Sequence, residues 1–420
     1  MKKISIISIF ALAVNLLSAQ GSFTLEQCIN AAIETHPLSK QNELLANSSN
    51  LQNRIYDIAV LPTVQLNAQA TYQSDVTSIP ISLPNLSLPS LPHEQYKATV
   101  DVNELIYGAG VYKQQKLIEN DNLAINMSKT ESDLYQVKER VSQLYMAVLL
   151  ADKNLDVINA AGDELKNRLG KVESGIKNGI LLQSSADVIK VEILKNQQRL
   201  IELKALRKSL LEALTVLTGI SFDENSVFTS PAPAPELNYM NNKPEFNTFR
   251  LQQNRLEHMQ LLSKKKLYPK LLGFGTAGYG NPALNMFDID GQFFYLVGVK
   301  LNWTIWDWKQ SRYESEMFGV SKDMISLQQQ ALDRTLKAQW VQYFTEIEKY
   351  NELIKTDNSI IKMRNDILKS AASQLENGTM TGTDYVTEQN TNMQAELSRN
   401  LHEIQLMQVK LNMLAVTGKL

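Results

Sequence analysis

Histidine and cysteine, the side chains that most often bind metals or act as nucleophiles and bases, are few in this chain and lie far apart in the sequence. The four histidines are His36, His93, His258 and His402, and Cys28 is the only cysteine. No pair of histidines has a metal-binding spacing, and no segment has the pattern of a nucleophile elbow or a glycine-rich phosphate loop. A single cysteine allows neither an intrachain disulfide nor a zinc cluster built on thiolates. We therefore expect no enzyme, no cofactor and no metal, and we interpret the histidines as solvated surface residues.

The charge and the first residues of the chain narrow the class of protein further. The formal net charge of −2 argues against a nucleic-acid partner. Lys2 and Lys3 precede an apolar run over 4–17, and Leu17-Ser18-Ala19 is a plausible cleavage site, which predicts a signal peptide over 1–19. No later segment is apolar for the length of a membrane-spanning helix. We expect an exported protein that is not a helical membrane protein.

The chain is an internal duplication of one large unit. Pro37 and Pro244 are 207 residues apart, and the same offset relates Leu61-Pro62 to Tyr268-Pro269 and Tyr72 to Tyr279. After the middle of each copy the offset becomes 199, which relates Asn103 to Asn302, Gly179 to Gly378 and Thr218-Gly219 to Thr417-Gly418. A repeat of this length indicates two copies of a large unit rather than a solenoid. We expect a first repeat over 20–220, a linker over 221–243 and a second repeat over 244–420.

The middle of each copy has the alternation of a β-hairpin, about 62–106 in the first copy and about 269–306 in the second. Over 64–73 the apolar residues Val64, Leu66, Ala68, Ala70 and Tyr72 alternate with uncharged polar residues, and 96–103 continues the pattern. Each run of about ten residues is long enough for a tilted strand to cross a bilayer. Aromatic residues near the ends of the strands are candidates for membrane-interface anchors, namely Tyr72, Tyr96, Tyr279, Tyr295, Trp303 and Trp306. The prolines over 79–92 predict an extended loop.

The same alternation is also typical of a soluble antiparallel sheet with one buried face. The predicted signal peptide favours a membrane sheet. Four strands cannot close a transmembrane barrel, and lipid does not tolerate an open sheet edge. The membrane interpretation therefore requires several copies of the chain to share one barrel.

After each hairpin the sequence predicts two long antiparallel helices, about 108–219 and about 308–418. No proline interrupts 110–175, and apolar residues recur there and over 309–377 at helical spacing. At 1.5 Å per residue, about 65 residues make a rod on the order of 100 Å, which must pack on other helices. Glycine-containing turns follow each long helix, with Ser184 or Ser185 and Thr383 or Asp384 as expected N-caps of the returning helices. A helical hairpin turn explains these residue types without any further function.

These features together resemble the TolC-like outer-membrane efflux protein family over the whole mature chain. The segments that carry the resemblance are Leu25 to Ala32 with His36-Pro37-Leu38, Leu61-Pro62, Lys243-Pro244-Glu245-Phe246, Leu267-Tyr268-Pro269-Lys270, Val299 to Trp303, and Gly378 with Asp384-Tyr385 before Thr417-Gly418. The resemblance implies a homotrimer in the cell outer membrane. Each protomer would give four strands to a twelve-stranded β-barrel and its helices to a periplasmic α-helical barrel. The residues around 221–242 would form an equatorial region.

The resemblance also implies a function and a site. The chain would be the channel-tunnel of a tripartite efflux or secretion system, passively conducting solutes from an inner-membrane transporter and a periplasmic adaptor protein to the exterior. The turns at the periplasmic tip would form the gate and the adaptor docking site, with Gly175, Gly179, Ser185, Gly378, Thr379 and Asp384 as the candidate residues. Three copies of Asp384 would form an acidic ring that repels anions and binds cations.

Two positions depart from the family's best-known gate. Met380 stands where that gate has an arginine, and Leu375 stands where it has a tyrosine. We therefore expect closure to depend on apolar packing. Asp187 does not match Asp384 in the other copy and is interpreted as ordinary charge in a first helical turn.

The main alternative function is a secreted or periplasmic coiled-coil structural or adhesive protein, which would suit the long amphipathic helices. It leaves the paired alternating hairpins unexplained. A passive porin is a third possibility, but porins use many more strands per chain and no long helices.

Overall fold

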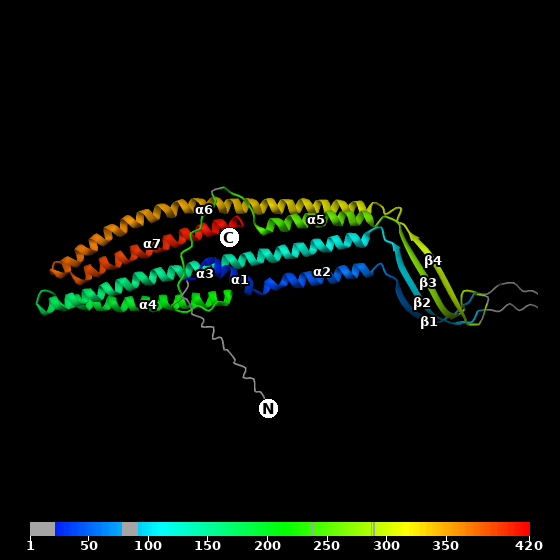
Figure 1. Ribbon diagram of the computed structural model, residues 1–420, viewed down its shortest axis with the longest axis horizontal. Helices are drawn as coiled ribbons and strands as arrows, with labels where there is room; N and C mark the ends of the chain where they lie inside the picture. The colour runs from blue at the N-terminus through cyan, green and yellow to red at the C-terminus, as the bar shows by residue number, and fades with distance from the viewer. Residues whose placement is uncertain (1–21, 78–90, 237, 287, 289) are drawn as a thin grey trace, which may run out of the picture. The chain divides into compact units, whose positions relative to one another are not determined.

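The computed structural model describes residues 22–77, 91–236, 238–286, 288 and 290–420. The predicted signal peptide and most of the proline-containing loop lie outside these residues. The described elements are α1 (Leu25–Thr35), η1 (Pro37–Lys40), α2 (Gln41–Ile58), β1 (Thr63–Tyr72), β2 (Glu94–Tyr107), α3 (Val111–Lys177), α4 (Gln183–Thr218), α5 (Pro244–Lys265), β3 (Lys270–Asn281), β4 (Gln292–Asn302), α6 (Gln310–Glu376) and α7 (Gly382–Val416) (Figure 1). The described residues are therefore mostly helical with one four-stranded antiparallel sheet, as expected for one protomer.

Corresponding elements of the two halves of the chain have nearly the same length. The helices α3 and α6 each have 67 residues, and α4 and α7 have 36 and 35. The turns between them contain Gly179 and Gly378, which have φ angles of 74° and 72°. Positive φ is the conformation that glycine adopts without a steric cost.

The two hairpins form a single sheet in the order β1-β2-β3-β4. The register places apolar residues opposite apolar residues, for example Leu66 opposite Val100, Ala98 opposite Tyr279, and Ala277 opposite Tyr295. Directly paired residues share a face of the sheet, so the predicted apolar positions form one continuous apolar face. This face is exposed rather than packed, since Leu66 is 77% and Val297 is 76% accessible. The described residues of the chain therefore do not bury this face themselves.

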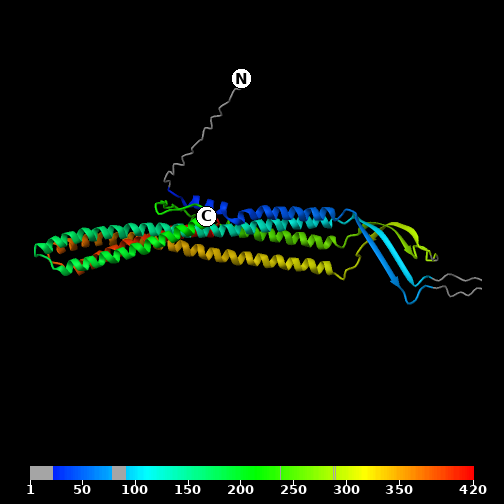
Figure 2. The same cartoon turned by 90° about the horizontal axis from the view of Figure 1, so that it is seen from below.

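The outer edges of this sheet are β1 and β4, and neither has a further partner strand among the described residues (Figure 2). Their backbone groups on the outer side are available for pairing with another chain.

The chain divides into two compact units that do not coincide with the two sequence repeats. One unit contains the described residues up to Ser39 together with Asp133–Lys243 and Thr335–Leu420, and the other contains Lys40–Ser132 and Pro244–Arg334. Each unit takes segments from both repeats, and the boundary falls within α3 and within α6. We call them the tip unit and the sheet unit.

In the tip unit, the linker and the start of the chain are fixed to α3 and α4. Phe23 forms a parallel bridge with Phe228. The buried Tyr145 hydroxyl lies 2.7 Å from the carbonyl oxygens of both Phe23 and Thr229, to which it donates. Arg207 donates to the carbonyl oxygens of Glu224 and Ser226, at 2.9 and 2.8 Å. These contacts give the predicted linker a defined path across the helices.

In the sheet unit, the neighbouring helices are α2, α3, α5 and α6 in that order. They adjoin β1, β2, β3 and β4 in the chain, so helices and strands have the same spatial order. Asn53 of α2 bonds Asn120 of α3 at 3.0 Å, Ser128 of α3 bonds Thr248 of α5 at 2.8 Å, and Gln260 of α5 donates to the Ser315 carbonyl of α6 at 2.8 Å. The outer helices are therefore α2 and α6, and each carries an exposed apolar stripe. The stripe on α2 is Leu44, Leu51, Ile55 and Ile58, and that on α6 is Met317, Val320, Met324 and Leu327.

None of the helices in the described ranges combines the length and the apolar character needed to cross a membrane.

Candidate functional site

The candidate site is built on the two turns at the end of the helical hairpins in the tip unit. In the first turn, the Ile180 amide donates to the Gly175 carbonyl at 2.9 Å, which closes the loop over Gly179. In the second turn, the Thr379 amide donates to the Gln374 carbonyl at 3.0 Å over Gly378. Both turns are thus glycine C-caps in the left-handed conformation, and they satisfy carbonyl groups that a helix end leaves without partners.

The N-caps of the returning helices differ from the sequence prediction. Leu182 is the N-cap of α4 and makes no side-chain cap bond, whereas Thr381 is the N-cap of α7 and accepts from the Asp384 amide at 3.2 Å. The predicted caps were wrong because the observed N-caps lie two or three residues earlier than expected. Asp384 instead lies in the first turn of α7, where its carboxylate accepts from the Thr381 hydroxyl at 2.7 Å and has a favourable interaction with the helix dipole.

The two turns pack directly on each other. A Cβ atom placed on Gly382 would lie 2.7 Å from the Cα atom and 2.8 Å from the carbonyl oxygen of Ser185. Such distances leave no room for any side chain, so Gly382 is required for this approach. Of the candidate residues, the structure brings Ser185 to the start of α7 and Gly378 next to the Ile180 carbonyl. Gly382 is not among the sequence candidates, although it lies in the segment Thr381-Gly382-Thr383 directly before the candidate Asp384.

An apolar cluster lies beneath the turns. Leu375 and Tyr385 are fully buried in it, together with Val172 and Ile189, and Met380 packs against it. The two positions at which the chain departs from the family's gate therefore both make apolar contacts.

A polar network next to this cluster connects the two helical hairpins. The Tyr385 hydroxyl donates to Glu164 at 3.1 Å, and Arg168 bonds Glu164 at 2.7 Å and also Glu376. Lys171 bonds the same Glu376 carboxylate at 2.8 Å. The Arg168 guanidinium also lies over the Tyr385 ring, 5.2 Å from its centroid. The network joins α3, α6 and α7, and the sequence prediction missed all five residues.

Burial and hydrogen bonding set the charge states in this network. Burial raises the pKa of the Tyr385 hydroxyl to about 12, so the hydroxyl remains a neutral donor at physiological pH. The hydrogen bond from Lys171, with the nearby Arg168, lowers the pKa of the Glu376 carboxyl.

The outer surface of the tip is partly apolar. Ile180 is 58% and Leu182 is 75% exposed, and they lie in the first turn beside the exposed polar residues Thr379 and Asp384 of the second hairpin. Neither apolar side chain is covered by the described residues of the chain. Their signal in the sequence was the apolar run from Ile180 to Leu182 inside a loop.

A groove of about 620 Å³ runs along α3, α6 and α7 next to the network. Its walls include Glu164, Arg168 and Glu376, and its floor includes Gln389 and Asn392. The side-chain oxygens of Gln389 and Asn392 are buried and have no hydrogen-bond partner among the described residues.

The predicted interface aromatics lie at the two ends of the sheet. At the end where β1 and β3 finish and β2 and β4 begin, Tyr96 stacks on Tyr279 with ring centroids 6.3 Å apart, and Tyr279 contacts Phe293 at 5.0 Å. Tyr72 and Tyr295 lie at the same end and are 74% and 78% exposed. At the opposite end, which we call the helix end of the sheet, Trp303 and Trp306 follow β4 and are 57% and 67% exposed. Phe293, at 86% exposure, was not among the predicted residues.

Two of the four histidines are not solvated surface residues as predicted. His258 bonds Asp121 at 2.5 Å and His402 bonds Asp357 at 2.7 Å, and both rings are partly buried between helices. Each pair connects neighbouring helices. Within the described part of the chain, no three His, Cys, Asp or Glu side chains are placed to hold a metal ion. Burial raises the pKa of the Cys28 thiol to about 11, which keeps it protonated.

Comparison with known proteins identifies the fold. No protein-family model matches the chain, and no curated protein is similar to it in sequence. Solved structures do match. The outer membrane protein VceC from Vibrio cholerae is 12% identical with a TM-score of 0.67, and the match covers 94% of this chain and 96% of that one. The Campylobacter jejuni CmeC outer membrane channel is 14% identical with a TM-score of 0.66, covering 94% and 85%. The Neisseria gonorrhoeae MtrE outer membrane channel, in its open state, is 12% identical with a TM-score of 0.66, covering 94% and 89%.

The chain therefore has the fold of these outer membrane channels over almost its whole length. This confirms, for the fold, the resemblance to the TolC-like family that the sequence indicated.

Proposed function

We propose that this protein is the outer-membrane channel of an efflux or secretion system and that it conducts solutes passively to the exterior. The observation that carries the proposal is the match to solved outer membrane channels over 94% of the chain.

The exposed apolar face and open edges of the sheet support a shared barrel. A sheet with unpaired edges is unstable in lipid, and β1 of one copy can pair with β4 of the next. Three copies would then close a twelve-stranded barrel with its apolar face toward the lipid. The exposed stripes on α2 and α6 lie on the corresponding outer helices and would meet across the same interface. Both features support the homotrimer.

The spacing of the aromatic residues agrees with a membrane location. Tyr295 lies near the start of β4, Trp303 directly follows its end, and the two are eight residues apart. At about 3.4 Å per residue this is about 27 Å along the strand, close to the height of the apolar band of an outer-membrane barrel. We propose Tyr72, Tyr96, Tyr279 and Tyr295 as the anchors at one interface and Trp303 and Trp306 as those at the other. The helices would then lie in the periplasm, and the two repeats, joined by the linker over 221–243, would each supply half of a protomer.

The tip would receive the periplasmic adaptor, which connects the channel to an inner-membrane transporter. The proposed docking and gate residues are Gly175, Gly179, Ser185, Gly378, Thr379 and Asp384, and the structure adds Ile180 and Leu182 as exposed apolar contacts. In a trimer, the three Asp384 carboxylates would form a ring of like charge that favours cations.

The experiment that tests the proposal measures assembly and conductance together. Mature protein extracted in mild detergent should have the mass of a trimer and should form steady pores in planar bilayers. Asp384→Ala should reduce the preference of the pore for cations, because it removes the carboxylate ring. Asp163→Ala is the matched control, since Asp163 is an exposed carboxylate paired with Lys166, and it should leave the selectivity unchanged. A monomer that needs no detergent and forms no pore would refute the proposal and favour the coiled-coil structural protein.

A further inference from the structure

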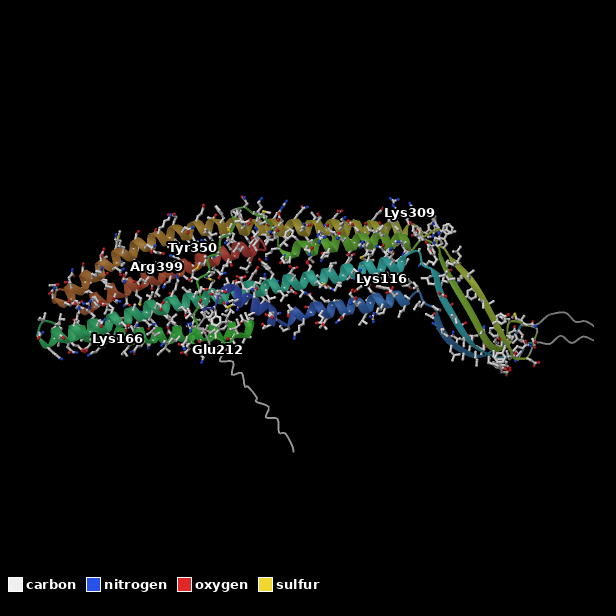
Figure 3. All side chains as sticks on the ribbon, viewed as in Figure 1. Lys116, Lys166, Glu212, Lys309, Tyr350 and Arg399 are labelled. Carbon is white, nitrogen blue, oxygen red and sulfur yellow. The ribbon has the colours of Figure 1, made fainter. Side chains whose placement is uncertain are left out.

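The helix end of the sheet carries a cluster of lysines beside its exposed aromatic residues. Lys264, Lys265 and Lys266 stand where α5 leads into β3, and Lys309 precedes α6. Figure 3 shows Lys309 at the end of α6 that faces the sheet. The aromatic residues are Tyr268, Trp303, Trp306 and Trp308, with exposures between 55% and 82%. We call these eight residues the basic rim.

Contacts between α5 and α6 bring the parts of the rim together. The Ser263 hydroxyl at the end of α5 donates to Glu314 at 2.6 Å, and Trp306 and Trp308 contact each other with centroids 5.8 Å apart. The three lysines at and just after the end of α5 therefore lie beside the start of α6, which Trp308 and Lys309 precede.

The rim lysines form no close ion pair among the described residues, and Lys266 helps to lower the pKa of the nearby Glu314 carboxyl. The ion pairs in this region of the described chain join Lys116 to Asp57, Arg312 to Glu316 and Lys322 to Glu257, and none includes a rim lysine. Asp307 is occupied as the cap of α6, accepting from the amides of Lys309 and Ser311 at 3.0 and 2.9 Å. The opposite end of the sheet has the opposite composition, with Asp75, Glu94, Asp288 and Asp290.

The backbone at Trp308 and Lys309 provides an independent observation. Both residues have positive φ, 51° and 66°, a conformation that is unfavourable for side chains other than glycine. The residues 199 positions earlier, Ala109 and Gly110, have the same backbone conformation, with φ of 54° and 73°. The first copy thus uses the smallest residues at this turn, and the second copy uses a tryptophan and a lysine. Backbone strain that is retained with large side chains is typical of a functional position.

We propose that the basic rim binds the anionic headgroups of phospholipids in the membrane leaflet that faces the helices. The tryptophan rings would lie at the level of the headgroups, and the lysines would extend to the phosphates. This inference rests on the proposed function, because it requires the sheet to lie in a membrane. The favoured ligand is phosphatidylglycerol or another lipid with a net negative headgroup, rather than a zwitterionic lipid.

The test compares lipid nanodiscs of phosphatidylcholine with discs that also contain phosphatidylglycerol. The wild-type trimer should dissociate at a higher temperature in the anionic discs and should retain phosphatidylglycerol over phosphatidylcholine by about tenfold or more on purification. The variant Lys264→Gln/Lys266→Gln/Lys309→Gln should retain the two lipids within about twofold of each other. The control Lys129→Gln/Lys337→Gln/Lys362→Gln removes three exposed lysines elsewhere on α3 and α6 and should behave as wild type.

A second variant separates lipid binding from a purely structural role. Lys309→Gly removes the strain of a positive φ at a residue with a side chain, so it should raise the dissociation temperature in phosphatidylcholine discs. Because it also removes a lysine, it should lower the preference for phosphatidylglycerol. Soluble glycerol phosphate should not reproduce the effect of the lipid on the wild type. Equal retention of both lipids by the wild type, or an unchanged preference in the triple variant, would overturn the inference. Failure to enter discs of either composition would instead refute the proposed function.

Discussion

At the scale of single residues, the contact that most directly connects the two hairpins is the Glu376 carboxylate, which bonds Arg168 and Lys171 of α3. The Arg168 side chain is only 9% exposed, whereas that of Glu376 is 38% exposed. Removing the carboxylate leaves Arg168 with Glu164 as its remaining partner.

We expect Glu376→Gln to destabilise the tip unit by about 1 kcal/mol, because solvent screens part of the interaction and Glu164 still pairs with Arg168. Amide hydrogens in the last turns of α3 and α6 should exchange faster in the variant than in the wild type, and hydrogen exchange measures this change. Glu352→Gln removes a carboxylate from an exposed pair with Lys355 and should leave exchange unaltered. Equal effects of the two substitutions would contradict the assigned contact.

The same carboxylate makes the stability of the tip depend on pH. The pKa of Glu376 is lowered in the folded chain from an ordinary value of 4.5. A carboxyl with a lowered pKa stabilises the fold fully above its unfolded pKa, and this stabilisation is lost as the pH falls below 4.5 through the folded pKa. The difference in tip exchange between wild type and Glu376→Gln should therefore be constant near neutral pH and should disappear in strong acid.

The residues of this network could not be predicted from the sequence. Helical periodicity over 110–175 and 309–377 indicates a buried face on each long helix, and Leu165, Val172 and Leu375 within these runs are buried. It does not determine which residue of one hairpin meets which residue of the other. Glu164 and Tyr385 are 221 positions apart, and only the packing of the hairpins brings them together.

At the scale of elements, the contact between the two turns depends on the missing side chain of Gly382. We expect Gly382→Ala to destabilise the tip unit by about 2 to 4 kcal/mol, because its methyl group would overlap the backbone of Ser185. The thermal unfolding of the purified trimer measures this effect.

Gly170→Ala is the matched control for that substitution. Gly170 lies inside α3, and a Cβ atom there would have no atom within 4 Å. Alanine should stabilise the helix by about 0.5 to 1 kcal/mol, since it is the better helix former. If both substitutions changed stability in the same direction, the close packing of the turns would be wrong.

The elements themselves were largely evident in the sequence, because their signals are local. Alternation identified the strands, and uninterrupted helical spacing identified α3 and α6. The exact starts of α4 and α7 were not evident, because the N-cap of α4 is Leu182, which makes no side-chain cap bond, and α7 has Thr381 and Thr383 as similar cap candidates. The pairing of His258 and His402 with aspartates was missed because each aspartate lies on another helix, which local sequence signals do not reveal.

At the scale of the whole molecule, the apolar stripe on α2 provides a test of the proposed assembly. We expect Leu51→Glu/Ile55→Glu to abolish the trimer, because the glutamates would place charge in the apolar interface between copies. Mass measurement in mild detergent would then find monomers. The control Asn50→Glu/Arg54→Glu introduces two glutamates at the same spacing on a neighbouring face of α2, the second replacing a cation, and should leave a trimer. A trimer in both variants would show that α2 is not at the interface.

The large-scale organisation was only partly accessible from the sequence. The offsets of 207 and 199 revealed the duplication, because related positions keep their residue types. They did not reveal that the compact units combine segments of both repeats, since a unit is defined by contacts that cross from one copy to the other.

The open edges of the four-stranded sheet have a genetic consequence. If every barrel takes its strands from three chains, one defective chain alters the whole pore. A chain with a mutation only in the tip still has intact β1 and β4 edges, so it still assembles with normal chains. A cell that makes equal amounts of normal chain and of a chain damaged only at its tip would form roughly one fully normal assembly in eight. Mutations in the tip should therefore behave as dominant, whereas mutations that destroy β1 or β4 should be recessive, because their products are excluded from assembly.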